Sequence, residues 1–363
     1  MHMADALLSP AVGLTMSAVS AAAVAYSVKK TKKTDLCDKK IPVMGVMGAF
    51  VFAAQMINFI IPATGSSGHI GGGILLAAMI GSYPALISIS AVLIIQSLLF
   101  ADGGILALGC TIFNLGVIPC LIIYPLIFKP LVKKGMTAGT ITLASIFSVV
   151  AALQLGAFGV VMQTTLSGIT ELPFVTFLLF MQPIHLAIGI AEGIITAAVL
   201  CFVYKIRPEI MESTFDRTAI KSGIPMKHVL VTLAVAAILA GGFLSLYASS
   251  LPDGLEWAIE KITGSTELAA KESSVIEGVA SIQETTSFMP DYNFRNAGED
   301  SSGAGTAIAG IAGCAVTFLF AWAVAVTISA VRKKRRSFQD TEGTGSTEGT
   351  EAQRNTSREK QDT

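Results

Sequence analysis

Long apolar stretches recur along the whole chain, and most are long enough to cross a lipid bilayer as helices. A membrane-spanning helix needs about 20 predominantly apolar residues. The pattern predicts an all-α polytopic membrane protein with about nine transmembrane helices, at residues 5–28, 42–61, 71–82, 84–100, 104–128, 137–163, 174–204, 229–249 and 306–331.

The third and fourth of these stretches are short, and the sequence Gly81-Ser82-Tyr83-Pro84 separates them. Pro84 disfavours helical geometry at the preceding residue, which predicts a tight turn between two helices. The alternative is one kinked helix, which would reverse the orientation of every later span. The positions of Lys and Arg distinguish these interpretations, because basic residues concentrate in the cytoplasmic loops of membrane proteins.

With nine spans, every basic cluster falls on one side of the membrane. The loops 62–70, 101–103 and 164–173 contain no Lys or Arg. We therefore predict that the N-terminus faces outward and the C-terminus inward. The clusters follow the first, fifth, seventh and ninth spans: Lys29, Lys30, Lys32, Lys33, Lys39 and Lys40; Lys129, Lys133 and Lys134; Lys205, Arg207, Arg217, Lys221 and Lys227; Arg332, Lys333, Lys334, Arg335 and Arg336.

The composition agrees with a membrane protein, since 52% of residues are hydrophobic and only 14% are charged, against about a quarter charged in soluble domains. Neither a disulfide framework nor a zinc site is predicted, and no basic patch for nucleic acid is visible. The motifs GxxxxGK[ST] and HExxH are absent, so ATP hydrolysis would require another polypeptide. The five cysteines lie without CxxC spacing, at Cys37, Cys110, Cys120, Cys201 and Cys314.

The opening segment, MHMADALLSP, has no basic residue before its apolar run and a basic cluster behind it. This order is the reverse of a secretory signal, so we predict a retained, outward-facing segment that keeps Met1. The α-amine of Met1 and the imidazole of His2 would then lie together at the outer surface.

His2 and His69 are predicted on the same side of the membrane. An α-amine, the next amide nitrogen and the imidazole of residue two can form fused chelate rings around one metal ion, and a second imidazole can complete four nitrogens. Such a set suits Ni(II) or Cu(II) and is acceptable to Co(II). Glycines flank His69 in ATGSSGHIGGG and permit close backbone approach. Alternatively, His2 is a solvated terminal residue and His69 an interfacial loop histidine.

Five further residues could support such a site. Asp102, in an outward turn, could orient an imidazole or cap the next helix, and Asp5 has the same two interpretations. His185 and Glu192 lie seven residues apart on one face of the seventh span and could form an ion path or a structural hydrogen-bond network. Asn114 is an interhelical hydrogen-bond candidate, as are Gln55, Asn58, Gln96 and Gln154.

The region between the last two spans contains LPDGLEWAIEK at 251–261. Its turn residues and periodicity predict a short amphipathic helix that caps the outer face. The loop 250–305 carries ten Asp and Glu against three Lys and Arg. It is interpreted as a solvated spacer, with loose attraction of cations as the alternative.

Four stretches resemble the signatures of the CbiM/NikM family: MHMADALLSP, SGHIGGGILLAAMIG, QSLLFADGGILALGCTIFNLGV and IHLAIGIAEG. Members of that family are the substrate-capturing membrane subunits of energy-coupling factor (ECF) transporters for cobalt and nickel. The resemblance covers about residues 1–228. The PDGLE stretch resembles the domain that replaces or accompanies the CbiN/NikN subunit, expected here at 229–331, before a disordered cytoplasmic tail at 332–363.

The resemblance implies that Met1, His2 and His69 hold the transported ion, although Ala4-Asp5-Ala6 stands where the family usually has Pro-Asp-Gly. It further implies capture of extracellular Co(II) or Ni(II) in the cell membrane of a prokaryote. ECF ATPase subunits and a T-component would be the partners, and the chain would have no prosthetic group and no enzyme activity. From the residues alone, an ion-coupled secondary transporter or channel that uses His185 and Glu192 is the alternative.

Overall fold

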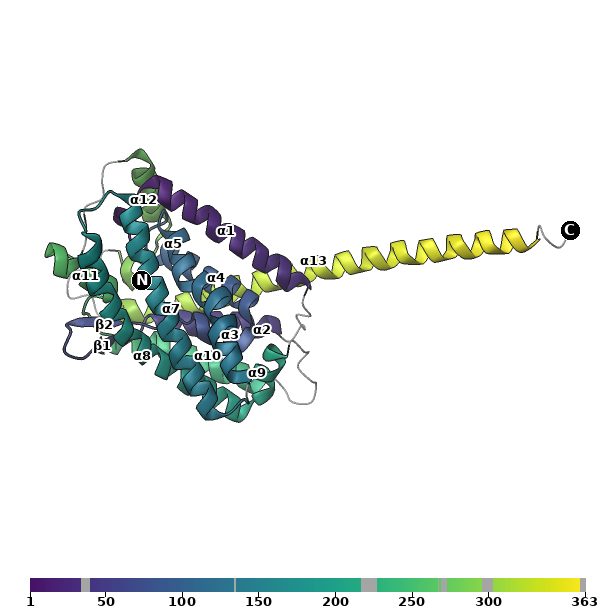
Figure 1. The fold of residues 1–363 in the computed structure, drawn as a ribbon, viewed down its shortest axis with the longest axis horizontal. Coiled ribbons are helices and arrows are strands. Elements are labelled where there is room, and N and C mark those ends of the chain that lie inside the picture. Colours follow the sequence, from purple (N-terminus) through teal and green to yellow (C-terminus); the bar gives the residue numbers. More distant parts are fainter. Residues whose placement is uncertain are drawn as a thin grey trace.

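The computed structural model describes residues 1–33, 40–133, 135–216, 227–266, 268, 273–295 and 303–359. Figure 1 shows a helical bundle from which the last part of α13 projects. The elements are η1 (Asp5–Leu7), α1 (Pro10–Lys33), α2 (Lys40–Gln55), β1 (Phe59–Ile61), β2 (Ser66–Gly68), α3 (Gly73–Ile80), α4 (Ser82–Phe100), α5 (Leu108–Ile112), η2 (Phe113–Phe128), α6 (Lys129–Lys133), α7 (Ala138–Ser167), α8 (Phe174–Ile206), α9 (Pro208–Phe215), α10 (Lys227–Gly242), η3 (Leu244–Tyr247), α11 (Gly254–Thr263), α12 (Ser274–Thr286), η4 (Pro290–Tyr292) and α13 (Ala304–Glu359).

Seven helices of the described chain are long and apolar enough to cross a membrane, which confirms a mostly helical, polytopic membrane protein. Two of the nine predicted spans are shorter than a bilayer requires. The apolar part of α2 is Pro42–Gln55, and the eight residues of α3 extend only about 12 Å. The spanning segments are Pro10–Thr31, Ser82–Phe100, Leu108–Lys133, Ala138–Ser167, Phe174–Ile206, Leu230–Tyr247 and Ala304–Val331.

Two separate helices, α3 and α4, stand where the Gly81–Pro84 turn was predicted. Gly81 is the single residue between the two helices, and its φ is 92°. This is a conformation that glycine adopts without steric cost. Pro84 lies in the first turn of α4, where its missing N–H costs nothing. All residues of α3 are buried in the protein, so this helix lies inside the bundle.

The first span begins later than its apolar pattern predicts. At the predicted start the structure has only the short 3₁₀ helix η1, and α1 starts at Pro10. Proline is favoured at the first position of a helix. The preceding segment is instead folded into the protein, with Met3, Leu7 and Leu8 buried. Hydropathy cannot distinguish a lipid-facing helix from such a buried segment, since both need apolar residues.

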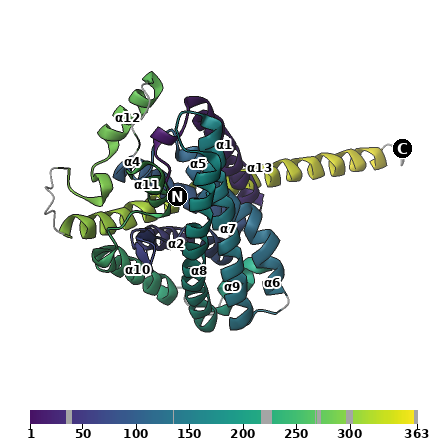
Figure 2. The same ribbon diagram turned by 60° about the vertical axis from the view of Figure 1, so that its left-hand side comes forward.

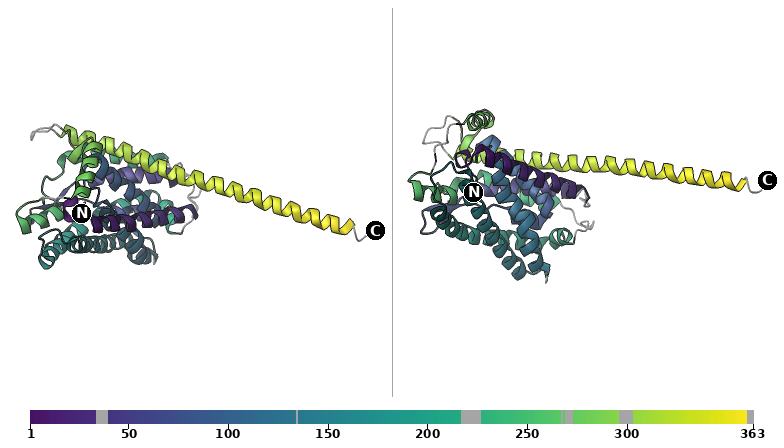
Figure 3. Two further views of the ribbon diagram at one scale, coloured as in Figure 1. Left: turned by 90° about the horizontal axis from the view of Figure 1, so that it is seen from above. Right: turned by 45° about the horizontal axis from the view of Figure 1, so that its top comes forward.

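Two sets of helices make the most extensive contacts within the bundle. Helices α7 and α8 lie side by side and contact each other extensively, as Figure 2 shows. Helices α10 and α13 pack on each other and on α2, and Figure 3 shows α13 crossing the bundle before it extends away. The strands β1 and β2 form a short antiparallel hairpin in which Phe59 pairs with Gly68.

The region 250–305 is more than the predicted solvated spacer. It contains α11, the amphipathic helix that LPDGLEWAIEK predicts, which buries Leu255, Ala258 and Ile259. It also contains α12 and η4, and Tyr292 of η4 stacks on Phe100 with ring centroids 4.9 Å apart. These apolar side chains hold the region against the bundle, because leaving them in water would cost burial energy.

Some predicted features lie outside the described residues. The four described cysteines are free thiols. The helix α13 extends to Glu359. The disordered tail predicted at 332–363 stays a prediction. Among the residues named in the sequence analysis, those whose backbone or side chain is not described are Lys32, Lys33, Cys37, Lys39, Lys40, Lys134, Arg217, Lys221, Lys227, His228, Arg332, Lys333, Lys334, Arg335 and Arg336.

Candidate metal centre

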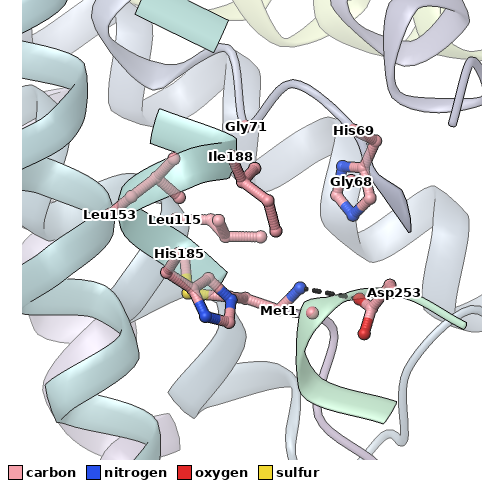
Figure 4. A pocket seen from close by; sticks show the side chains of 10 residues that line it. Met1, Gly68, His69, Gly71, Leu115, Leu153, His185, Ile188 and Asp253 are labelled. Atoms are coloured by element: carbon pink, nitrogen blue, oxygen red, sulfur yellow. Dashed lines mark hydrogen bonds and ion pairs between the residues drawn. The ribbon is translucent and has the colours of Figure 1, made fainter. Parts of the chain in front are cut away.

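The first residue of the chain lies inside the protein. Met1 is only 4% exposed, and its α-ammonium group donates to Asp253 Oδ2 over 3.1 Å. Figure 4 shows the amine directed at Asp253, with His69 and His185 on other sides of the same pocket. Burial by itself would raise the pKa of the Asp253 carboxyl, but the ammonium charge, His69 and the hydrogen bonds that the carboxylate accepts together hold this pKa well below the usual range.

The segment that carries Met1 and His2 is fixed by the loop before α5. Gly104 N donates to Met3 O over 2.9 Å, and Ala107 N donates to Asp5 Oδ1 over 2.9 Å. A side chain at Gly104 would overlap the Asp5 carboxyl, which explains glycine at that position. The turn expected of Pro-Asp-Gly forms in Ala4-Asp5-Ala6 as well, since Leu7 N donates to Ala4 O over 3.1 Å.

Both ring nitrogens of His2 face oxygen atoms. Nδ1 lies 3.4 Å from Asp102 Oδ1 and Nε2 lies 3.2 Å from Gln96 Oε1. Burial lowers the pKa of His2, and this effect outweighs the opposing charge of Asp102. A neutral imidazole has one N–H, so His2 can donate to only one of these two oxygen atoms.

His69 follows the β1–β2 hairpin and lies against His2. The two rings stack, with centroids 5.2 Å apart and planes 28° from parallel. His69 Nδ1 lies 3.1 Å from the carbonyl oxygen of Ile70, which leaves Nε2 without its hydrogen. Burial, the charge of the α-amine and the neighbouring His2 lower the pKa of His69 to about 4. Its imidazole is therefore neutral near pH 7.

Two spaces meet at these groups. A cavity of about 10 Å³ is lined by Met1, His69, His185 and Asp253 among others, and is just large enough for one water molecule or a bare ion. A larger cavity of about 750 Å³ is lined by His2, His69 and Asp102 among others. A small solute can thus approach both imidazoles, whereas only a single atom fits beside the amine.

The structure brings Asp102 to the site but gives Asp5 and Asn114 supporting positions. Asp102 contacts His2 and accepts a 2.5 Å hydrogen bond from the Tyr292 hydroxyl. Asp5 binds the backbone before α5, as above, and burial raises its pKa. Asn114 and Gln163 form a reciprocal amide pair, in which Asn114 Nδ2 donates to Gln163 Oε1 over 2.9 Å. The same amide nitrogen lies 3.9 Å from Met3 Sδ.

His185 and Glu192 each line a small cavity together with Met1. His185 donates from Nδ1 to Met181 O over 2.8 Å, and its Nε2 has no partner among the described residues. Glu192 Oε1 accepts from Gly72 N over 3.0 Å. Gly72 adopts a positive φ of 76°, and a side chain there would collide with Val51. Glu192 therefore holds the turn that follows His69.

The sequence did not reveal the roles of three residues at the site. In the sequence, Asp253 was only one of the turn residues before a short helix, Gln96 was an interhelical hydrogen-bond candidate, and Tyr292 carried no signal. The described residues contain no cluster of three or more His, Cys, Asp or Glu side chains that could hold a metal ion. Met1, His2 and His69 instead offer an amine, a backbone nitrogen and two imidazoles, a donor set that suits Ni(II) and Co(II).

Comparison with known proteins identifies the family. A model described as the cobalt uptake substrate-specific transmembrane region, CbiM, matches residues 2–210. The chain belongs to the CbiM family. A second model, the PDGLE domain, matches residues 227–330. This CbiM member therefore joins two family domains in one polypeptide, and the resemblance seen in its sequence motifs is confirmed.

Relatives of similar organisation carry names of metal transporters. A protein of Archaeoglobus fulgidus, provisionally named as the fused nickel transport protein NikMN, is 29% identical over 89% of this chain and 98% of its own length. The fused nickel transport protein NikMN of Rhodobacter capsulatus is 27% identical over 74% of this chain and 79% of its own. A crystal structure of a transition metal transporter is 30% identical, covers 59% of this chain and 98% of its own, and has a TM-score of 0.50.

Proposed function

We propose that this CbiM-family protein captures extracellular Co(II) or Ni(II) and delivers it inward as the substrate-binding membrane subunit of an ATP-driven ECF importer. The observation that carries the proposal is the meeting of the α-amine, His2 and His69 at one buried point. Those groups come from two distant segments, and their rings stack at 5.2 Å. The ion would bind Met1, His2 and His69, and it is the transported substrate.

The electrostatics of the site favour a cation. The lowered pKa values of His2 and His69 keep both imidazoles unprotonated near neutral pH, and unprotonated nitrogen is the form that binds metal. The Asp102 carboxylate lies beside His2 Nδ1, and the Asp253 carboxylate lies beside the Met1 amine. A divalent ion that binds through the α-amine and the next backbone nitrogen displaces one proton from each, so its two charges replace those of two protons.

The distribution of basic residues supports an outward-facing site. The Met1 segment and the β1–β2 hairpin gather at one end of the bundle, while α1 runs from this end to its basic C-terminal turn at the opposite end. The positive-inside rule then assigns the site to the external face. Separate ATPase subunits and a T-component, proposed from the family resemblance, would supply energy for inward release.

Metal binding to the purified full-length chain tests the proposal. Equilibrium dialysis with Ni(II) and with Co(II) should give one ion per chain, and His2→Ala and His69→Ala should each remove most of the binding. His228→Ala is the matched control, because residue 228 stands at the start of α10, away from the site. Retention of full binding by His69→Ala would disprove the assignment.

A further inference from the structure

The PDGLE segment (residues 249–257) is bound to the hairpin that precedes His69. The backbone N–H of Ser67 donates to Pro252 O over 2.8 Å, and the Ser67 hydroxyl donates to the preceding carbonyl of the segment over 2.7 Å. Trp257 Nε1 donates to the hairpin turn over 2.9 Å. These bonds join the second family domain to the loop that carries one of the imidazoles.

Asp253 lies at the centre of this segment and uses its two carboxylate oxygens differently. Oδ1 accepts the backbone N–H groups of Leu255 and Glu256 at 2.7 and 2.9 Å and caps α11. Oδ2 accepts from the Met1 amine, 252 positions away in the chain. Capping α11 therefore needs only one oxygen, and the other oxygen binds Met1 of the first domain.

A second connection runs from the same domain to His2. The Tyr292 hydroxyl binds Asp102 Oδ2, and Asp102 Oδ1 faces His2 Nδ1. The second domain thus reaches the amine, the hairpin before His69 and, through one carboxylate, His2. Among these connections, only the Asp253 side chain contacts a proposed metal ligand directly.

We propose that Asp253 is a positioning residue for metal capture, which the PDGLE domain supplies to the site of the CbiM domain. A metal-bound primary amine retains N–H groups, so Oδ2 can accept one of them while the nitrogen lone pair binds the ion. The carboxylate orients the amine and partly neutralises the charge of the ion. Groups that are hydrogen-bonded to metal ligands commonly act in this way. This inference rests on the proposed function, because it assumes that the amine binds metal.

Substitutions at residue 253 separate this role from helix capping. Asparagine caps helices as well as aspartate does, but its second polar group is an NH₂ donor that cannot accept from the amine. Asp253→Asn and Asp253→Ala should both weaken Ni(II) binding to the purified full-length protein by about 10–100-fold. Glu256→Gln is the control, because it changes a carboxylate in the same turn and retains an acceptor for Asp253 N.

Two outcomes would overturn the inference, and a third would overturn the proposed function on which it rests. Wild-type affinity in Asp253→Asn, with weakened binding only in Asp253→Ala, would show that the residue acts as a cap and would overturn the proposal. At saturating Ni(II), the absorption spectrum of Asp253→Asn should match that of wild type, and a changed spectrum would mean direct coordination and overturn the outer role. If the wild-type protein bound no Ni(II), the proposed function itself would fail.

Discussion

Extending the chain at its N-terminus tests the role of the α-amine most directly. A short uncleaved extension turns the amine into an amide, which is a poorer metal ligand and carries no charge for Asp253. Met1 lines two cavities of about 10 and 20 Å³, and neither can hold an additional residue. The extension must therefore pull the first residues out of the bundle.

The size of the effect follows from what is lost. A hydrogen bond to a charged group contributes about 1.5–3 kcal/mol, and the Met1–Asp253 contact is of this kind. Exposing the buried Met1 side chain costs about a further 1.5–3 kcal/mol. Together these amount to about 3–6 kcal/mol, and because every 1.4 kcal/mol corresponds to a factor of ten, the apparent affinity for metal should fall by about 10²–10⁴-fold.

Isothermal titration calorimetry with Ni(II) can measure this effect in one preparation. The extension should end in a site-specific protease sequence whose cleavage regenerates Met1, and the affinity tag should contain no histidine. Binding should be weak before cleavage and restored afterwards, while an equal extension at the C-terminus should have no effect. Equal Ni(II) affinity before and after cleavage would refute the role of the amine.

Two further predictions concern protonation and the turn after His69. The pKa of His69 is lowered to about 4, so its neutral, metal-binding form persists as pH falls below 6.5. In the metal-free protein, an NMR titration of the His69 ring should therefore show no protonation between pH 7 and 5, and a transition near 6.5 would contradict this. Glu192→Gln retains an acceptor for Gly72 N and should preserve metal uptake by cells, whereas Glu192→Ala leaves that N–H unpaired and should lower the unfolding free energy by about 1–3 kcal/mol. Loss of uptake in Glu192→Gln, with normal thermal unfolding, would favour an ion path.

From the residues alone, the pairing of His2 with His69 was one of two open interpretations, and the resemblance to the CbiM/NikM family selected it; the structure places the two rings in a stack. The sequence also predicted two helices around Gly81, since the proline and glycine there have local consequences. Asp253 could not be found in this way. A helix cap looks the same in the sequence whether or not its second oxygen binds another segment, and that partner lies in a different domain.

The length of the spans was harder to predict for a related reason. Apolar composition reports burial, and it does not report whether lipid or protein covers the residues. The opening segment and α3 are both apolar, yet the structure buries them inside the bundle. Gly72 ends any helix that would extend α3 toward His69, because its positive φ is incompatible with helical geometry.

Chain ends are usually the least ordered part of a protein, but here the N-terminal residue is enclosed by elements from both family domains. The pocket around it is therefore complete only when α8 and α11 are both in place. A half-made or misfolded copy would not assemble the nitrogen donors and would not sequester a toxic ion. Quality control over metal loading would then be a by-product of the architecture itself.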